Sequence, residues 1–318
     1  MEKVSIIVPM YNVEQYVEKC LNSLINQTFE DIKIYAISDG SPDNSINIAK
    51  KVAEKDKRIV CIEKENGGYG SVLEYAISKI KSKYFCICDP DDWMEENAIE
   101  ILYNSIEEHS CDLAVGNLYD YYQDGTKKEK NVVNNCNPNQ VYEAGNLINF
   151  ALAGVSPHSK LYKTTIAKKI LFPHKISYTD TVLYLVYLSN INSAIFIDRP
   201  LSYHFIDRDG NSNADLLSFS MKAFNQLITI YESIFTQVDV NSKDYNYIVF
   251  ALYKKLNYLR QNIKFLNIEE KKEARKRLKY LSKKILINKK DLSKNINDKN
   301  LFKKYLKRLR LYLFEYLI

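Results

Sequence analysis

The chain has 318 residues, of which 46% are hydrophobic and 26% are charged. This is the composition of a folded globular protein, and it excludes the collagen-like, disulfide-stapled and disordered classes. The formal net charge of +6 is unevenly divided, because residues 254–318 hold 21 Lys or Arg and 6 Asp or Glu, while the rest of the chain is acidic. Such a basic tail is suited to an anionic partner such as a membrane surface, nucleic acid or an acidic protein.

The start of the chain reads as a strand, VSIIVPMY, without the basic and apolar regions of a signal peptide. No apolar run reaches the length that spans a membrane. We therefore expect a cytoplasmic protein, or one held peripherally at the inner face of the plasma membrane. The six cysteines form no C-x-x-C pair, and we expect reduced thiols.

Short apolar, β-branched runs alternate with amphipathic helical patterns over the first third of the chain. Strands are expected at 4–8, 32–37, 59–62, 84–88 and 113–115, and helices at 13–25, 45–55, 72–81 and 95–108. This alternation indicates βαβ units, and we expect an α/β fold with a mostly parallel sheet flanked by helices. Ligands bind such sheets at the carboxyl edge, where four predicted loops meet: PMYN, SDGS, NGGYG and DPDD.

The sequence pattern of the remaining residues changes twice, first at a polar stretch and again where all patterns become helical. A polar stretch at 119–140 predicts an exposed hairpin or loop. After it we expect helices at 146–153, 164–169 and 180–190, a turn leading to a short strand within SPHSKLYK (156–163), a strand at 194–197, and a polar loop at 203–215. All later patterns are helical, at 216–236, 243–266, 269–287 and 298–317. We therefore expect a domain at 1–215 and a basic, all-α domain at 216–318.

The stretch YFCICDPDDW, residues 84–93, is the most informative part of the sequence. A buried strand runs directly into Asp89, Asp91 and Asp92, three carboxylates within four positions. Carboxylates crowded at a strand end repel one another unless a cation holds them. A divalent metal that carries a phosphorylated substrate is the simplest occupant. The alternative is a solvated acidic turn that opens a helix.

Five segments, taken together and in order, resemble a known family: VSIIVPMYN, NQTF, SDGSPDNS, ENGG and DPDDW. They look like the nucleotide-sugar-binding half of a family 2 glycosyltransferase, an inverting enzyme with the Rossmann-like GT-A fold. The resemblance covers residues 1–110 strongly and 155–213 more weakly. It implies transfer of a sugar from a UDP-sugar to a glycan, polysaccharide, lipid-linked or glycoprotein acceptor, with Mn²⁺ or Mg²⁺ as cofactor.

The resemblance also implies roles for individual residues. Those of the donor nucleotide site would be Pro9, Tyr11, Asn12, Asp39, Asn66, Gly67, Asp89, Asp92 and Arg208. Asp39 would accept a hydrogen bond from the base, and Tyr11 would lie against it or merely pack at the strand end. The metal ligands would be Asp89, Asp91 and His204, and the sequence leaves open which carboxylate binds the metal and which the ribose.

The base that an inverting displacement requires would be Asp180, in a segment that resembles the second half of the family pattern. A helix-capping role is the alternative for this aspartate. His158 and Lys160 fall in a region that resembles the wall of the acceptor site. The chain departs from the family pattern at Ser38, Leu73, Glu74 and Thr179. These departures sustain a second hypothesis, a non-catalytic, transferase-like scaffold that recruits a partner through its basic helices.

The basic tail itself allows two interpretations. Residues 301–318, LFKKYLKRLRLYLFEYLI, suit a helix lying in a membrane interface, or a helix packed on its neighbours with lysines toward water. The helical domain would position the acceptor or mediate self-association into a homo-oligomer. No recognised nucleic-acid-binding module accompanies the charge, so nucleic acid is not an expected partner.

Overall fold

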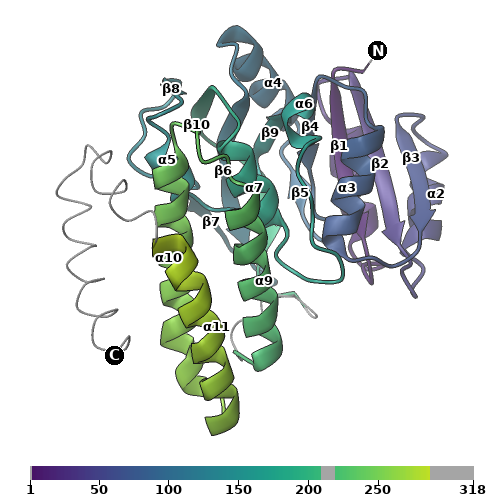
Figure 1. Ribbon diagram of the computed structural model, residues 1–318. Helices are drawn as coiled ribbons and strands as arrows, with labels where there is room; N and C mark the ends of the chain where they lie inside the picture. Colours follow the sequence, from purple (N-terminus) through teal and green to yellow (C-terminus); the bar gives the residue numbers. More distant parts are fainter. Residues whose placement is uncertain (1, 209–218, 287–318) are drawn as a thin grey trace.

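The computed structural model describes residues 2–208 and 219–286 (Figure 1). The predicted helix at 298–317, the basic segment 301–318 and most of the predicted loop at 203–215 lie outside these residues. Among the helices of the described ranges, none combines the length and the hydropathy that a membrane span requires.

The amino-terminal half alternates strands and helices as the hydrophobic pattern predicts. Its elements are β1 (Val4–Met10), α1 (Val17–Ile25), β2 (Ile32–Asp39), α2 (Ser45–Ala53), β3 (Ile59–Lys64), α3 (Tyr69–Lys79) and β4 (Tyr84–Ile87). The strands lie in the order β3-β2-β1-β4, and each pairs with its neighbour in parallel. All the carboxyl ends of these strands therefore lie at one edge of the sheet.

The second half extends the sheet in the order β9-β6-β10-β5. Its elements are β5 (Trp93–Met94), α4 (Ala98–Glu108), β6 (Leu113–Tyr121), β7 (Lys127–Lys130), β8 (Val141–Glu143), α5 (Ile148–Ala151), β9 (Lys160–Lys163), α6 (Thr164–Ala167), α7 (Asp180–Leu188) and β10 (Ser193–Phe205). β10 pairs with β6 in parallel, whereas β9 lies antiparallel to both β4 and β6. The sheet is therefore parallel over its first four strands and mixed beyond them.

Several elements differ in length from the sequence prediction, and β6 is one of them, since it continues to Tyr121 beyond the strand predicted at 113–115. The first helix begins at Val17 rather than at 13, because the chain first makes a tight turn in which the backbone N–H of Tyr16 donates to the carbonyl of Val13, 2.9 Å away. β10 continues to Phe205, past the predicted end of the strand at 197 and into the loop predicted at 203–215. The strand passes Pro200 with two shifts in its register against β6, and such irregularities are where a strand tolerates proline.

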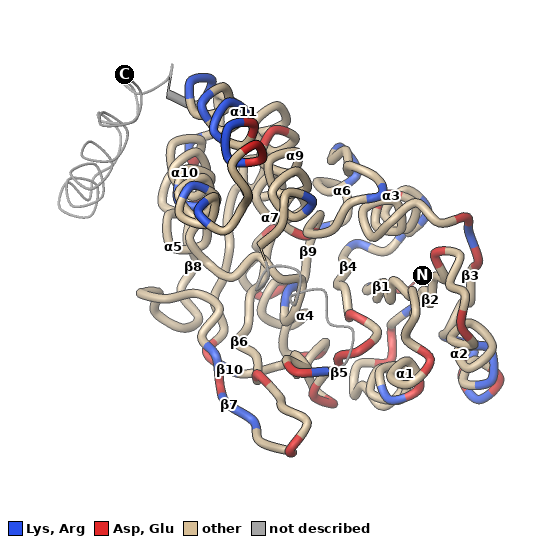
Figure 2. Tube along the Cα trace, turned by 90° about the horizontal axis from the view of Figure 1, so that it is seen from below, with Lys and Arg blue, Asp and Glu red and all other residues tan. Residues whose placement is uncertain are grey.

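Helices cover both faces of the sheet, and each face has its own hydrophobic core. The side chains of α1, α2 and α4 form one core, and those of α3 and α7 belong to the other. Figure 2 shows α3, α7 and the later helices on one side of the sheet and α1 and α2 on the other. Every residue of α7 from Thr181 to Leu188 is buried, because this helix lies between the sheet and a further helical layer.

That outer layer consists of α9 (Met221–Gln237), α10 (Tyr245–Asn262), a short 3₁₀ turn η1 (Ile263–Phe265) and α11 (Ile268–Leu286). Its apolar residues belong to the same continuous core as α3 and α7. Asp244, which precedes α10, accepts backbone N–H groups of Gly145 (2.7 Å) and Leu147 (2.9 Å). The helical layer is therefore joined to the sheet by apolar packing and by buried polar contacts.

Candidate functional site

The ends of β2 and β3 are joined by a buried carboxylate. Oδ1 of Asp39 accepts from Nζ of Lys64 (2.6 Å) and from the backbone N–H of Gly67 (3.0 Å), and Oδ2 accepts from that of Gly68 (2.7 Å). The side-chain amide of Asn66 donates to the Asp39 carbonyl oxygen at 2.9 Å. The aspartate predicted to contact a base thus also shapes the glycine-bearing loop beside it.

The backbone conformation of this loop requires a glycine at position 68. Its φ of +83° lies in the left-handed region, and a Cβ there would lie 2.9 Å from the backbone nitrogen of Lys175. Gly67 lies against Ser71 and its carbonyl oxygen accepts the Lys175 N–H at 2.7 Å. The loop is therefore held between Asp39 on one side and the segment before α7 on the other.

The first predicted loop follows β1 at the same edge. Pro9 is buried within β1, whereas the Tyr11 side chain is 52% exposed. Asn12 has a φ of +55°, and its backbone N–H donates to Oγ of Ser41 at 2.7 Å. The turn thus presents an exposed aromatic ring next to the loop that follows β2.

A compact group of metal-type ligands lies where β4 ends. One ligand atom each from Asp89, Asp92 and His158 can be chosen so that all lie within 4.8 Å of one another. Nε2 of His158 hydrogen-bonds Oδ2 of Asp92 and lies 3.9 Å from Oδ2 of Asp89. Nδ1 of His158 is buried and has no hydrogen-bond partner in the described part of the chain.

Burial raises the proton affinity of both carboxylates. Desolvation, with the neighbouring negative charges of Asp92 and Asp91, raises the pKa of Asp89 to about 7, against the opposing effect of His158. The pKa of Asp92 is raised well above its usual range by desolvation and by Asp91. Desolvation lowers the pKa of His158, which favours the neutral imidazole. Two buried carboxylates and a neutral imidazole fit a divalent cation, because the cation would offset the repulsion that now favours protonation.

The other two predicted metal ligands lie close by with different partners. Asp91 forms an ion pair with the guanidinium of Arg208, which also lies over the ring of Tyr16. Nδ1 of His204 lies 3.4 Å from Oδ1 of Asp120, and its ring centroid is 4.8 Å from that of His158. The structure therefore groups Asp89 and Asp92 with His158, and places Asp91 and His204 at the border of that group.

Asp180 occupies the first position of α7. Desolvation raises the pKa of its carboxyl group, while the backbone N–H of Thr181 and the positive charges of Lys255 and Lys160 oppose that rise. The Thr181 N–H donates to the carbonyl of Tyr178 at 3.2 Å, and the Asp180 carboxylate lies in the first turn of the helix, where a negative charge is favourable. Both of its sequence interpretations, base and helix terminus, are compatible with this position.

A family model described as glycosyl transferase family 2 matches residues 5–171, just over half of the chain. The chain belongs to this family. The matched segment contains Asp39, Asp89, Asp92 and His158 and ends before Asp180.

Individual proteins with similar sequences or folds agree with this assignment. The chain is 36% identical to glycosyltransferase GlyA of Streptococcus pneumoniae over 181 residues, 54% of this chain and 26% of GlyA. It is 30% identical to a poly(ribitol-phosphate) β-glucosyltransferase of Bacillus spizizenii over 216 residues, 65% of this chain and 33% of that protein. The chain thus spans only part of the length of these relatives.

A solved structure, Staphylococcus aureus TarS residues 1–349 in complex with UDP-GlcNAc, has the same fold. Its TM-score is 0.64 at 20% identity, and the similarity covers 91% of this chain and 90% of that chain. The similarity extends past residue 171 into the helical layer, and the GT-A fold expected from the sequence is confirmed.

Two residues close to the predicted carboxylates were not singled out from the sequence. The hydroxyl of Tyr69, the first residue of α3, donates to Oδ1 of Asp89 at 2.7 Å. Lys255, on α10, lies near Asp180 although 75 positions separate them, and desolvation lowers its pKa. Its sequence signal is a lysine on the buried side of the helix, three residues after Leu252 and one before Leu256. The outer helical layer therefore contributes a charge to the site.

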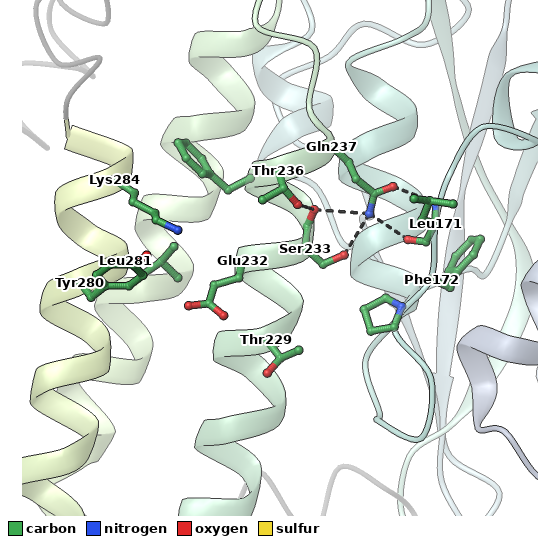
Figure 3. A pocket seen from close by; sticks show the side chains of 12 residues that line it. Leu171, Phe172, Thr229, Glu232, Ser233, Thr236, Gln237, Tyr280, Leu281 and Lys284 are labelled. Atoms are coloured by element: carbon green, nitrogen blue, oxygen red, sulfur yellow. Dashed lines mark hydrogen bonds between the residues drawn. The ribbon is translucent and has the colours of Figure 1, made fainter.

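A separate groove lies between α9, α11 and the segment 171–173, with a cavity volume of about 640 Å³ (Figure 3). The side-chain amide of Gln237 holds both the N–H and the carbonyl group of Leu171 at 2.8 Å. Thr229, Glu232, Ser233 and Tyr280 contribute to its lining. The groove contains none of the site carboxylates or histidines, and it is not part of the site at the sheet edge.

Proposed function

We propose that this family 2 protein transfers a sugar from a UDP-sugar to a glycan-type acceptor, with inversion, at the carboxyl edge of β1, β2 and β4. The observation that carries the proposal is the grouping of Asp89, Asp92 and His158 at the end of β4. Ligands of open α/β sheets bind at this edge, and the Asp39-supported loop lies there as well.

The donor nucleotide would occupy the space between the β1 and β2 loops. Tyr11 offers an exposed ring for the base, and Oδ2 of Asp39, which accepts one hydrogen bond from Gly68, has a lone pair for a second. Asn66 and Gly67 would approach the ribose and phosphates through their backbone. The UDP-GlcNAc complex of TarS supports a UDP-sugar as the donor class.

Mn²⁺ or Mg²⁺ would be held by Asp89 and Asp92, with Asp91, His158 and His204 as neighbouring candidates. The bound ion would neutralise the diphosphate as it leaves. An imidazole in the group favours Mn²⁺, since Mg²⁺ prefers oxygen ligands and water. Arg208 would contact the diphosphate once its ion pair with Asp91 is exchanged for that anion.

Asp180 would accept the proton of the acceptor hydroxyl while the acceptor oxygen forms its bond to the anomeric carbon and UDP departs. A raised pKa makes the carboxylate a better proton acceptor near neutral pH than an ordinary aspartate. Lys160 and Lys255 would keep enough of it ionised. Inversion requires this group on the face of the sugar opposite the leaving group.

The acceptor would be a hydroxyl of a glycan, polysaccharide, lipid-linked glycan or glycoprotein. Similarity to a poly(ribitol-phosphate) β-glucosyltransferase supports a polymeric acceptor of the cell surface within that class. The outer helices would position this acceptor or mediate self-association. The protein would act in the cytoplasm or at the inner face of the plasma membrane.

The departures from the family pattern do not favour the non-catalytic alternative. Leu73 is fully buried in the core, and Glu74 lies 2.7 Å from Nε2 of His174. Thr179 is buried at the start of α7, and Oγ of Ser38 accepts the Ser41 N–H. Ser38 and Thr179 stand where the family pattern has acidic residues, but Asp39, Asp89, Asp92 and Asp180 are all retained.

The test is a panel of UDP-sugars screened for slow hydrolysis with Mn²⁺, with Mg²⁺ and with a chelator, because hydrolysis requires no acceptor. We expect one UDP-sugar to be hydrolysed only when metal is present. Asp89→Asn should abolish this activity, and Asp180→Asn should spare UDP binding while removing transfer. Asp124→Asn, an exposed carboxylate of the β6–β7 turn, is the matched control. Absence of metal-dependent UDP or UDP-sugar binding by calorimetry would exclude the proposal.

A further inference from the structure

α11 has a solvent face with an unusual concentration of positive charge. The helix contains eight Lys or Arg and three Glu, and Figure 2 shows Lys and Arg gathered along it. Helical spacing places one set of exposed residues on the same side: Ile268, Lys272, Arg275, Lys276, Lys279 and Lys283. We call this set the α11 face.

The basic side chains of α11 outnumber its three glutamates, Glu269, Glu270 and Glu273. Within the described part of the chain, no ion pair joins a side chain of the α11 face to a carboxylate. The nearby Glu270 is occupied at the helix start, where it accepts the Asn267 N–H at 3.1 Å and its own N–H donates back to Asn267 at 2.9 Å. Residues 287–318 are themselves rich in lysine and arginine, so their charge does not complement the face. The charge of the face therefore suits an anionic partner other than this chain.

Exposed apolar side chains lie at the amino-terminal end of the same face. Phe265, the last residue of η1, is 65% exposed, and Ile268, the first residue of α11, is 85% exposed. Nζ of Lys264 lies over the Phe265 ring, 4.8 Å from its centroid. Large apolar side chains that are next to lysines and open to water are typical of surfaces that enter the interfacial layer of a bilayer.

We propose that the α11 face is a docking surface for an anionic lipid bilayer. The lysines contact headgroup phosphates, and Phe265 and Ile268 enter the boundary between headgroups and acyl chains. The face is the convex side of a helix and offers no channel for a linear phosphate polymer, and the apolar pair would have no role with such a polymer. The surface uses described residues of α11 and is independent of the sugar-transfer proposal, because binding requires neither donor nor metal.

The experiment is vesicle co-sedimentation of the full chain with phosphatidylcholine alone and with added phosphatidylglycerol, at low and high salt. Wild-type protein should sediment only with phosphatidylglycerol vesicles, and less at high salt. The variant K272Q/K276Q/K279Q/K283Q should lower the partition coefficient at least about tenfold, since one lysine near an anionic surface contributes roughly fivefold. The control K51Q/K55Q/K57Q/K81Q removes four exposed lysines elsewhere and should bind like wild type.

Two further comparisons separate a bilayer from other anions. F265S/I268S should weaken sedimentation with phosphatidylglycerol vesicles, whereas V240S, at a residue 66% exposed elsewhere, should not. Soluble polyphosphate is the probe for a polymeric partner. Sedimentation that does not depend on phosphatidylglycerol, unchanged sedimentation of the α11 variant, or polyphosphate binding without vesicle binding would each overturn the proposal.

Discussion

Replacing Asp39 by Asn removes the carboxylate that joins β2, β3 and the glycine loop. This carboxylate is 4% exposed, and it accepts hydrogen bonds from Lys64, Gly67 and Gly68. An amide of the same shape has only one accepting oxygen. At least one backbone N–H of the loop therefore loses its partner, and the ammonium of Lys64 loses its counter-charge.

The size of the effect follows from these two losses. Removing one partner of a buried ion pair costs about 3–5 kcal/mol, and an unsatisfied buried amide costs about 1–3 kcal/mol. Lys64 is 19% exposed and still donates to the carbonyl of Glu65 (2.6 Å) and to Ser71 Oγ (2.8 Å). These remaining contacts place the expected loss of stability at the lower end of the range for an ion pair. We expect Asp39→Asn to lower the free energy of unfolding by about 3 kcal/mol.

Urea denaturation followed by far-ultraviolet circular dichroism measures this change. The companion variants are Lys64→Met and the double variant, which together form a cycle that isolates the coupling of the two side chains. We expect the double variant to be more stable than the sum of the single losses predicts. A loss below about 1 kcal/mol for Asp39→Asn, or additive effects in the cycle, would refute the structural role assigned to this carboxylate.

Three further predictions address the base, the loop and an unpartnered hydroxyl. Because the pKa of Asp180 is raised, kcat/KM should fall as the pH drops through that pKa. Lys255→Gln removes a charge that lowers this pKa, so the acidic limb of the pH profile should move to higher pH by roughly 0.5 to 1 pH unit, on the order of 0.7–1.4 kcal/mol. An acidic limb that stays in place contradicts the assignment of Asp180 as the base. Gly68→Ala, at a φ of +83° and against Lys175, should lower the free energy of unfolding by about 2 kcal/mol in urea denaturation, and unchanged stability would show that the loop conformation is not required. The Thr164 hydroxyl is buried without a partner in the described part of the chain, so Thr164→Val should match or exceed wild-type stability by up to about 1 kcal/mol, whereas a clear loss would reveal a contact of that hydroxyl.

Local pattern in the sequence was enough to predict the parallel half of the sheet. β1, β2 and β4 are short apolar runs that end in polar turns, and parallel strands bring those turns to one edge whatever the rest of the chain does. The pattern of strands and turns alone therefore assigns Asp39 and Asp89 to one edge. The extension of β10 past Pro200 could not be predicted in this way, because it depends on pairing with β6.

For the same reason, the contacts between site residues that are far apart in the sequence could not be predicted from local sequence patterns. His158 pairs with Asp92 across 66 positions, and Lys255 approaches Asp180 from a helix in the outer layer. Spacing along the chain carries no information about such partners. The only local sign of such a contact is a polar residue on an otherwise apolar face of a helix or strand. This sign indicates that the residue has a partner, but it does not identify the partner.

The single core shared by α3, α7 and α9–α11 has a consequence for the synthesis of the protein. α7 leaves the ribosome before the helices that cover it, and its apolar residues remain uncovered while residues 221–286 are made. At about 5–20 residues per second, this interval lasts roughly 3–13 s. During that time the nascent chain exposes a helix that is buried in the folded protein. The incomplete chain is then most prone to aggregate and to bind chaperones.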